Sequence, residues 1–130
     1  LCPQNYLKLT RLFLESDAYI RERGILGMTS NNLNQLRENF PVLAEFSKRY
    51  PCSKLNFFRQ IILASRIQID QIPHLPLKVI YSEKDRLINP NCSIQIGKKF
   101  GVTPIPHPDA GHDLPLDAPE WLCDVLIGKN

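Results

Sequence analysis

The spacing of apolar residues predicts helices throughout the first part of the chain. From residue 4 to residue 23, apolar side chains recur mostly three, four or seven positions apart, which places them on one helix face. Gly24 and Gly27 are expected to end this helix, because the apolar pattern is interrupted there. Two further helices are predicted after polar residues suited to the N-cap position, at Ser30–Asn31 and at Ser53.

The pattern changes at Pro73, where short apolar runs begin to alternate with short helices. Residues 77–81 are an apolar run rich in β-branched residues, which predicts a buried strand. Residues 102–106 predict a second strand, placed near an edge by its two prolines. Two helices are predicted in the same part of the chain, at residues 91–100, where Gly101 ends the helix, and at residues 117–126, with Asp117 as the N-cap.

Two strands connected through a helix in so few residues form a parallel βαβ unit. Two strands alone would leave edges unpaired and a sheet face uncovered, so the sequence implies partner strands from upstream or from another copy of the chain. We therefore expect the isolated chain to self-associate through the strand at residues 77–81. The predicted fold class is α/β, with a helical segment at residues 1–72 and a βαβα segment at residues 73–130, incomplete on its own.

Composition and charge argue against several classes of function. The 130 residues are 43% hydrophobic and 22% charged, as in ordinary globular domains, and the net charge of +3 comes from basic residues spread along the chain. Without a concentrated basic face, no nucleic-acid partner is expected. The longest apolar run, Ile61–Ala64, is far shorter than the ~20 residues of a membrane span, and no signal peptide is recognisable. We expect no membrane partner and a cytoplasmic protein.

The four cysteines lie far apart in the sequence, at Cys2, Cys52, Cys92 and Cys123. They form no C-x-x-C pair, and no histidine lies at metal-ligand spacing from them, so neither a metal site nor another cofactor is expected. Two disulfides are possible in principle, but a chain of this length can bury a core without them. Reduced, partly buried thiols are the favoured prediction.

Two residues suited to acid–base chemistry follow the two predicted strands. Asp85 lies on the loop after the first strand, and His112 lies on the loop after the second. The carboxyl ends of parallel strands share one edge of a sheet, where ligands bind in open α/β folds, so these side chains are expected to meet. A carboxylate that binds one imidazole nitrogen fixes the tautomer, and the other nitrogen can then act as general base toward a hydroxyl nucleophile.

The segments around these two residues resemble the last third of an α/β-hydrolase. In that family the acid lies in a pattern G/S-x-x-D-x-Φ-Φ-x-P, where Φ is hydrophobic, and here the pattern matches Ser82–Pro90. The family's histidine lies in a small-Gly-His stretch before a proline and a short helix, matched here by Ala110-Gly111-His112 and Pro115. The resemblance covers residues 73–128 and implies that Asp85 and His112 are catalytic. It also implies that residues 1–72 are a helical cap over an apolar, small-molecule acyl substrate.

Other residues in these segments have simpler interpretations. Five aromatic residues of the expected cap could line an acyl pocket, but each is better explained as helix-packing core: Phe40, Phe46, Tyr50, Phe57 and Phe58. His107 is interpreted as structural or pocket-lining, His74 as a surface residue, and Trp121 as packing the last helix on the sheet. Asp109, Asp113 and Asp117 could rival Asp85 as the acid but are better explained as loop and N-cap residues.

The chain departs from the family in one large respect, because no serine has the flanking glycines of the nucleophile elbow G-x-S-x-G. We therefore expect a C-terminal fragment of a cofactor-independent serine hydrolase that cleaves a carboxylic ester or related acyl compound and is inactive alone. One alternative is a non-catalytic binding or scaffold protein on the same fold. Another is haloalkane, epoxide or C–C bond chemistry, which would use the same acid and histidine with a different nucleophile or a changed reaction.

Overall fold

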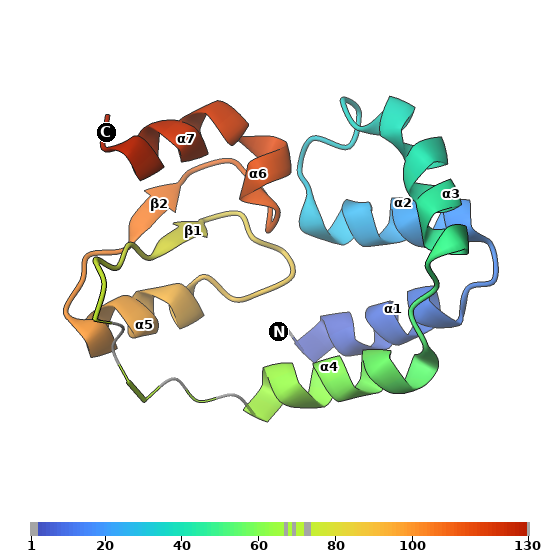
Figure 1. The fold of residues 1–130 in the computed structure, drawn as a ribbon, viewed down its shortest axis with the longest axis horizontal. Helices are drawn as coiled ribbons and strands as arrows, with labels where there is room; N and C mark the ends of the chain where they lie inside the picture. Colours follow the sequence, from blue (N-terminus) through green and yellow to red (C-terminus); the bar gives the residue numbers. More distant parts are fainter. Residues whose placement is uncertain (1–2, 67, 69, 72–73, 130) are drawn as a thin grey trace.

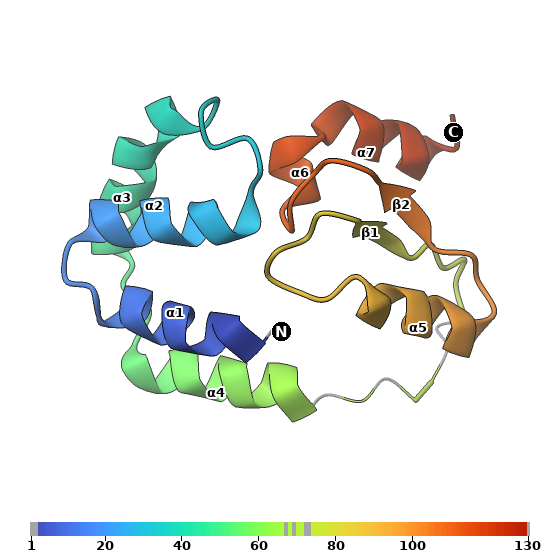
Figure 2. The same ribbon diagram turned by 180° about the vertical axis from the view of Figure 1, so that it is seen from behind.

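The computed structural model describes residues 3–66, 68, 70–71 and 74–129 and shows two neighbouring parts (Figure 1). The first part is helical and the second contains a small parallel sheet, so the structure is mostly helical with a minor β component. Both views of the ribbon show the end of α2 beside the loops that follow the two strands (Figures 1 and 2). In the described part of the chain, no helix is long and apolar enough to cross a bilayer.

The helical part consists of four α-helices and one 3₁₀ turn: α1 (Pro3–Leu14), α2 (Ala18–Thr29), η1 (Arg37–Asn39), α3 (Phe40–Arg49) and α4 (Lys54–Arg66). Helix α4 begins after Ser53, whose hydroxyl accepts a hydrogen bond from the backbone N–H of Asn56 at 3.2 Å, as the sequence predicted. Pro41 lies in the first turn of α3, where its missing N–H costs no hydrogen bond, so it begins a helix.

The predicted single helix over residues 4–23 is wrong, because the chain turns between Leu14 and Ala18. Asp17 caps α2 there, its carboxylate accepting hydrogen bonds from the backbone N–H groups of Tyr19 at 2.8 Å and Ile20 at 3.1 Å. Gly24 lies inside α2 and does not end a helix.

The absence of a side chain at Gly24 serves the packing of α1 against α2. A Cβ atom at this position would lie 2.2 Å from a methyl carbon of Leu12 on α1. A larger residue at this position would therefore require the end of the Leu12 side chain to shift. The sequence predicted a helix end at Gly24 and Gly27, but both lie inside α2.

The predicted N-cap at Ser30 is also wrong. Ser30 follows the last turn of α2 in an extended conformation, and its N–H donates to the carbonyl of Leu26 at 2.8 Å. The next residues turn through η1, so no helix begins at Ser30–Asn31. The apolar residues Leu26, Leu36 and Phe40 instead form a buried cluster between α2 and α3, with Leu33 packed against it.

The second part has the predicted strand–helix–strand–helix order: β1 (Ile80–Ser82), α5 (Asn91–Phe100), β2 (Ile105–His107), α6 (Leu114–Asp117) and α7 (Pro119–Ile127). The strands pair in parallel with Ile80 opposite Ile105 and Ser82 opposite His107. Each strand is shorter than predicted and starts later along the chain, because pairing of the two strands begins only at that register. Gly101 ends α5 in the left-handed conformation at φ 67°, as expected for a helix stop.

The last helix begins later than predicted, and Asp117 is not its N-cap. A short helix, α6, ends at Asp117, and Ala118 precedes α7. Trp121 of α7 packs edge-on against the ring of His107 in β2, with 4.7 Å between ring centroids, which confirms its predicted packing on the sheet.

The aromatic residues of the helical part divide between core and surface. Phe40 is buried at 3% exposure, whereas Phe46, Tyr50 and Phe58 are 63%, 58% and 48% exposed, so the prediction of packed core is wrong for these three. Phe57 stacks on Phe13 with 4.0 Å between ring centroids, which holds α4 against α1.

Replacing Phe40 by alanine is expected to lower the free energy of unfolding by about 3–5 kcal/mol, because the change empties the centre of the Leu26–Leu36 cluster. The matched control is Phe46→Ala on the same helix, whose ring is exposed, with an expected change within about 0.5 kcal/mol. Urea unfolding followed by circular dichroism measures both values. Equal losses for the two variants would contradict this assignment of the core.

Self-association of the isolated chain stays a prediction. In the described residues β1 pairs only with β2, and several large apolar side chains of α4 are exposed, including Leu55, Ile62 and Leu63. Light scattering at increasing protein concentration should show species larger than 14.9 kDa. A mass that stays at one chain over the whole range would rule self-association out.

Candidate active site

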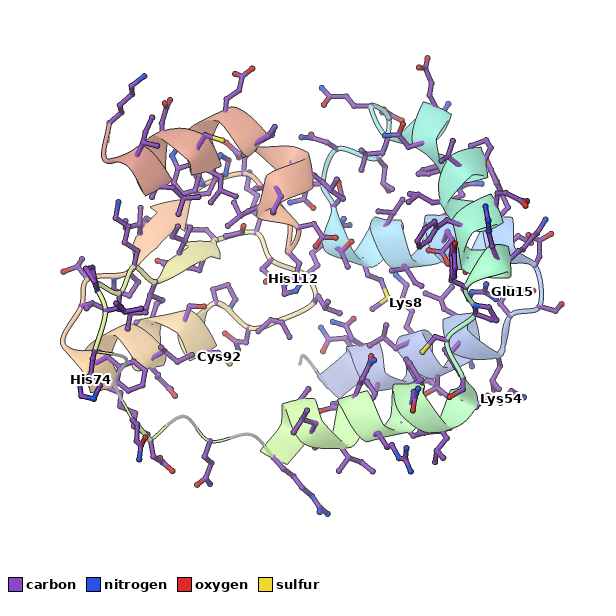
Figure 3. All side chains as sticks on the ribbon, in the orientation of Figure 1. Lys8, Glu15, Lys54, His74, Cys92 and His112 are labelled. Atoms are coloured by element: carbon purple, nitrogen blue, oxygen red, sulfur yellow. The ribbon has the colours of Figure 1, made fainter. Side chains whose placement is uncertain are left out.

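The two loops that follow the strands meet beside the end of α2, and they carry the residues selected from the sequence. Figure 3 shows His112 on the side of the sheet part that faces the helical part. Asp85 follows the last residue of β1 by three positions, and His112 follows the last residue of β2 by five. Because β1 and β2 are parallel, both loops leave the same edge of the sheet.

Asp85 is fixed by hydrogen bonds to its own loop. One carboxylate oxygen, Oδ1, accepts from the backbone N–H of Leu87 at 2.8 Å and of Ile88 at 2.9 Å. Its backbone N–H donates to the carbonyl of Ser82 at 3.3 Å, so the loop turns tightly at the end of β1. This arrangement is an Asx turn, in which an aspartate side chain accepts from backbone N–H groups a few residues later, and it leaves the second oxygen to bind a residue outside the loop.

The second carboxylate oxygen, Oδ2, lies 2.8 Å from Nδ1 of His112, although the two residues are 27 positions apart in sequence. The predicted meeting of the two side chains is therefore present in the structure, while their catalytic role stays a prediction. An ionised carboxylate only accepts hydrogen bonds, so Nδ1 carries the proton and Nε2 is the nitrogen left to act as base. The Asp85 side chain is 12% exposed and that of His112 is 39% exposed, so the acid is shielded while the base remains accessible.

The hydrogen bond between Asp85 and His112 favours the ionised carboxylate and the protonated imidazole, so it lowers the pKa of the acid and raises the pKa of the base. Burial alone would raise the pKa of Asp85, but the hydrogen bonds from His112, Ile88 and Leu87 outweigh it and lower the pKa below 3.8. The hydrogen bond to Asp85 raises the pKa of His112 above 6.5, against the opposing effect of burial. A base with a raised pKa binds the proton of a nucleophile more strongly.

The other acidic residues near His112 have different partners. Asp109 is exposed and pairs with Lys84, whose Nζ lies 2.5 Å from Oδ1 of Asp109 and lowers the pKa of that carboxyl group. Asp113 precedes α6 without a capping hydrogen bond from its side chain. These two residues are loop residues in the structure, and Asp85 is the carboxylate that binds His112.

Neither of the other histidines contacts the pair. Nδ1 of His107 accepts hydrogen bonds from the backbone N–H groups of Ala110 at 2.9 Å and Asp109 at 3.2 Å, so His107 shapes the turn that leads to His112. This is the structural role that the sequence indicated. His74 is exposed, as predicted for a surface residue.

The carboxylate of Asp117 is a feature that sequence reasoning missed. It accepts hydrogen bonds from the Ser30 hydroxyl, from the Asn31 N–H at 2.8 Å and from the Gly111 N–H at 2.6 Å. It therefore joins the end of α2 to the residue before His112. The only signal in the sequence was an acidic side chain close to the histidine, which an N-cap explained equally well.

The cavity lined by aromatic residues of the helical part is a different one from the hollow beside Asp85. A cavity of about 480 Å³ between α1, α2 and α4 is lined by Phe13, Tyr50 and Phe57 among others, and it contains neither Asp85 nor His112. A second, shallower hollow of about 620 Å³ contains Asp85, with Leu33 and Arg86 in its wall. The less favoured sequence interpretation, an aromatic acyl pocket beside Asp85 and His112, is therefore not formed by the residues that the structure describes.

The described thiols and the titratable groups show no metal centre. Cys52, Cys92 and Cys123 are free and exposed, so their predicted partial burial is wrong, and Cys2 lies outside the described residues. In the part of the chain that the structure describes, no group of three His, Cys, Asp or Glu side chains is arranged to hold a metal ion.

Comparison with protein-family models, curated protein sequences and solved structures found no significant match for this chain.

The Asp85→Asn variant should lower the pKa of His112 below 6.5. The hydrogen bond and the charge that raise this pKa are lost, while burial, which lowers it, remains. The amide of asparagine donates to Nδ1 and so moves the ring proton to Nε2. NMR titration of the imidazole carbons and nitrogens measures both the pKa and the tautomer.

The control for this titration is Asp109→Asn, which removes a negative charge much closer to His112 in sequence than Asp85, but one that pairs with Lys84. Its His112 should titrate as in the unchanged chain, and a His112 that titrates identically in Asp85→Asn and Asp109→Asn would contradict the pairing.

The two shifted pKa values also predict how the stability of the fold depends on pH. The raised pKa of His112 stabilises the folded chain below pH 6.5, and this contribution is lost as pH rises through the folded value. The lowered pKa of Asp85 contributes above pH 3.8 and is lost as pH falls through its folded value.

Proposed function

We propose that this chain supplies the acid and the base of a serine-type α/β-hydrolase that cleaves a carboxylic ester or a related acyl compound without a cofactor. The observation that carries the proposal is the 2.8 Å hydrogen bond between Asp85 Oδ2 and His112 Nδ1 on two loops at one sheet edge. The motif around Asp85 and the Ala110-Gly111-His112 stretch, both similar to that family, add support.

In the proposed reaction, Asp85 holds His112 in the tautomer with its proton on Nδ1. Nε2 takes the proton of a serine hydroxyl as the serine oxygen attacks the ester carbonyl, and His112 then gives that proton to the departing alcohol. Water, deprotonated by the same nitrogen, cleaves the acyl-serine, and the proton returns to the serine. Asp85 stays ionised and stabilises the imidazolium that forms in each step.

The nucleophile is proposed to lie on a polypeptide segment outside these 130 residues, because the sequence contains no G-x-S-x-G elbow. Ser30 does not fill this role: it is fully buried and its hydroxyl donates to Asp117. Ser82, at the end of β1, is 2% exposed and so is closed to a substrate. On this proposal the 130-residue chain alone hydrolyses no ester, because His112 has no activated hydroxyl to deprotonate.

The test is His112→Ala in a longer polypeptide that contains both a G-x-S-x-G elbow and this chain in one reading frame, called here the longer product. Turnover of an ester panel should fall about 10⁴-fold or more, because the general base is lost from the reaction path. The matched control is His74→Ala, an exposed histidine of the same chain, with unchanged kcat/KM.

Two outcomes would overturn the proposal. Hydrolysis by the 130-residue chain that depends on His112 would place the nucleophile within it. Absence of turnover by the longer product, with acyl compounds still bound, would favour a binding or scaffold protein of the same architecture.

A further inference from the structure

The end of α2 contacts both loops that form the catalytic pair. On the acid loop, the guanidinium of Arg86 donates to the carbonyl of Ser30 at 2.7 Å, and the amide of Asn31 donates to the carbonyl of Lys84 at 3.4 Å. Lys84 and Arg86 are the two chain neighbours of Asp85. The end of α2 therefore holds the acid from both sides through its neighbours.

The same segment holds the histidine loop. The N–H of Asp113 donates to the carbonyl of Thr29 at 2.9 Å, and the amide of Asn31 also donates to the carbonyl of Asp109 at 3.0 Å. Asp113 follows His112 directly, so this contact fixes the chain on one side of the histidine.

Asp117 fixes the other side of the histidine. Its Oδ2 accepts from the N–H of Gly111, the residue before His112, at 2.6 Å, and from the N–H of Asn31 at 2.8 Å. Its Oδ1 accepts from the hydroxyl of the fully buried Ser30. One carboxylate oxygen thus accepts from two backbone N–H groups, one in the histidine loop and one in the segment just after α2.

Close approach at this bridge requires the glycine. A Cβ atom at position 111 would lie 2.5 Å from the carbonyl oxygen of Thr29 and 3.0 Å from Oδ2 of Asp117. Burial alone would raise the pKa of Asp117, but hydrogen bonds from Asn31, Ser30, Gly111 and Asn32 outweigh it and lower that pKa. The bridge is therefore made by an ionised carboxylate at neutral pH.

We propose that Asp117 is a positioning residue for the catalytic pair, which ties the histidine loop to the end of α2 so that His112 reaches Asp85. The effect of Asp117 on catalysis rests on the proposed function, but its effect on the contact between His112 and Asp85 can be measured in the chain without a substrate. This role makes the helical part a component of the proposed active site: if the end of α2 moves away, Asp113 loses its acceptor on Thr29, and Asp117 loses its donors on Ser30 and Asn31.

The test is Asp117→Asn in the 130-residue chain, with the pKa of His112 read by NMR titration. An amide keeps the size of the side chain but loses the charge, so the hydrogen bonds from the N–H groups of Asn31 and Gly111 weaken, and its NH₂ group cannot accept from the Ser30 hydroxyl. The histidine loop loosens, the hydrogen bond to Asp85 weakens, and the pKa of His112 falls toward 6.5. Ser30→Ala, which removes one of the three donors, should shift this pKa in the same direction by less.

Two control variants separate positioning from general destabilisation. Asp109→Asn removes a nearby carboxylate that does not contact α2 through its side chain, and Val125→Ala weakens the core at a residue 2% exposed in α7. Both should leave the pKa of His112 at its unchanged value, even where Val125→Ala lowers the melting temperature. In the longer product, Asp117→Asn should lower kcat by about 10²-fold with little change in KM, as expected for misplaced catalytic groups.

A folded Asp117→Asn chain whose His112 titrates as in Asp109→Asn would overturn the proposal. If Asp117→Asn does not fold, Ser30→Ala decides, and an unchanged His112 pKa in that variant has the same meaning. A wild-type His112 pKa at or below 6.5 would also overturn the proposal, because there would be no pair to position. These outcomes are independent of ester turnover, so failure of the proposed function is distinguishable from failure of this one.

Discussion

Hydrogen bonds from the end of α2 are the constraint on which the rest of the site depends. The sheet has only two strands of three residues each, which fixes where the two loops start but not where their side chains finish. Thr29, Ser30 and Asn31 supply the missing restraint, because they bind the carbonyl of Lys84 and the guanidinium of Arg86 beside Asp85, and the backbone of Asp109 and Asp113 around His112. The helices before the sheet therefore help to hold Asp85 and His112 in place.

The geometry of the acid follows from the same need for restraint. A carboxylate bound only by the imidazole could rotate and still keep one hydrogen bond. The backbone N–H groups of Leu87 and Ile88 occupy Oδ1 of Asp85 and leave Oδ2 for His112, so rotation would cost two hydrogen bonds. These same bonds keep the acid ionised despite its burial, and an ionised acid is what stabilises a protonated His112.

The sequence predicted that Asp85 and His112 meet because a general rule of parallel sheets connects distant residues: strands that run the same way place their following loops at one edge. No comparable rule connects Asp117 to Ser30, which lie 87 positions apart and meet only through the packing of the two parts. Helical spacing grouped Leu33, Leu36 and Phe40, which do pack together, but it could not show that Phe46 is left exposed whereas Phe40 is buried. Gly24 shows the same limit, since close contact with Leu12 is invisible to a pattern within one helix.

The bridge at Asp117 also bears on how a cap could control chemistry. A cap connected only by a flexible linker could open without disturbing the groups beneath it. Here Thr29 and the two residues that follow α2 share hydrogen bonds with both loops and with Asp117, so an outward movement of α2 by a few ångströms would break them together. Because hydrogen bonds weaken steeply with distance and angle, the pair would lose its alignment before the site became fully open. The alignment of Asp85 with His112 and the position of the helical part therefore depend on the same hydrogen bonds, and the carboxylate of Asp117 is the group that connects them.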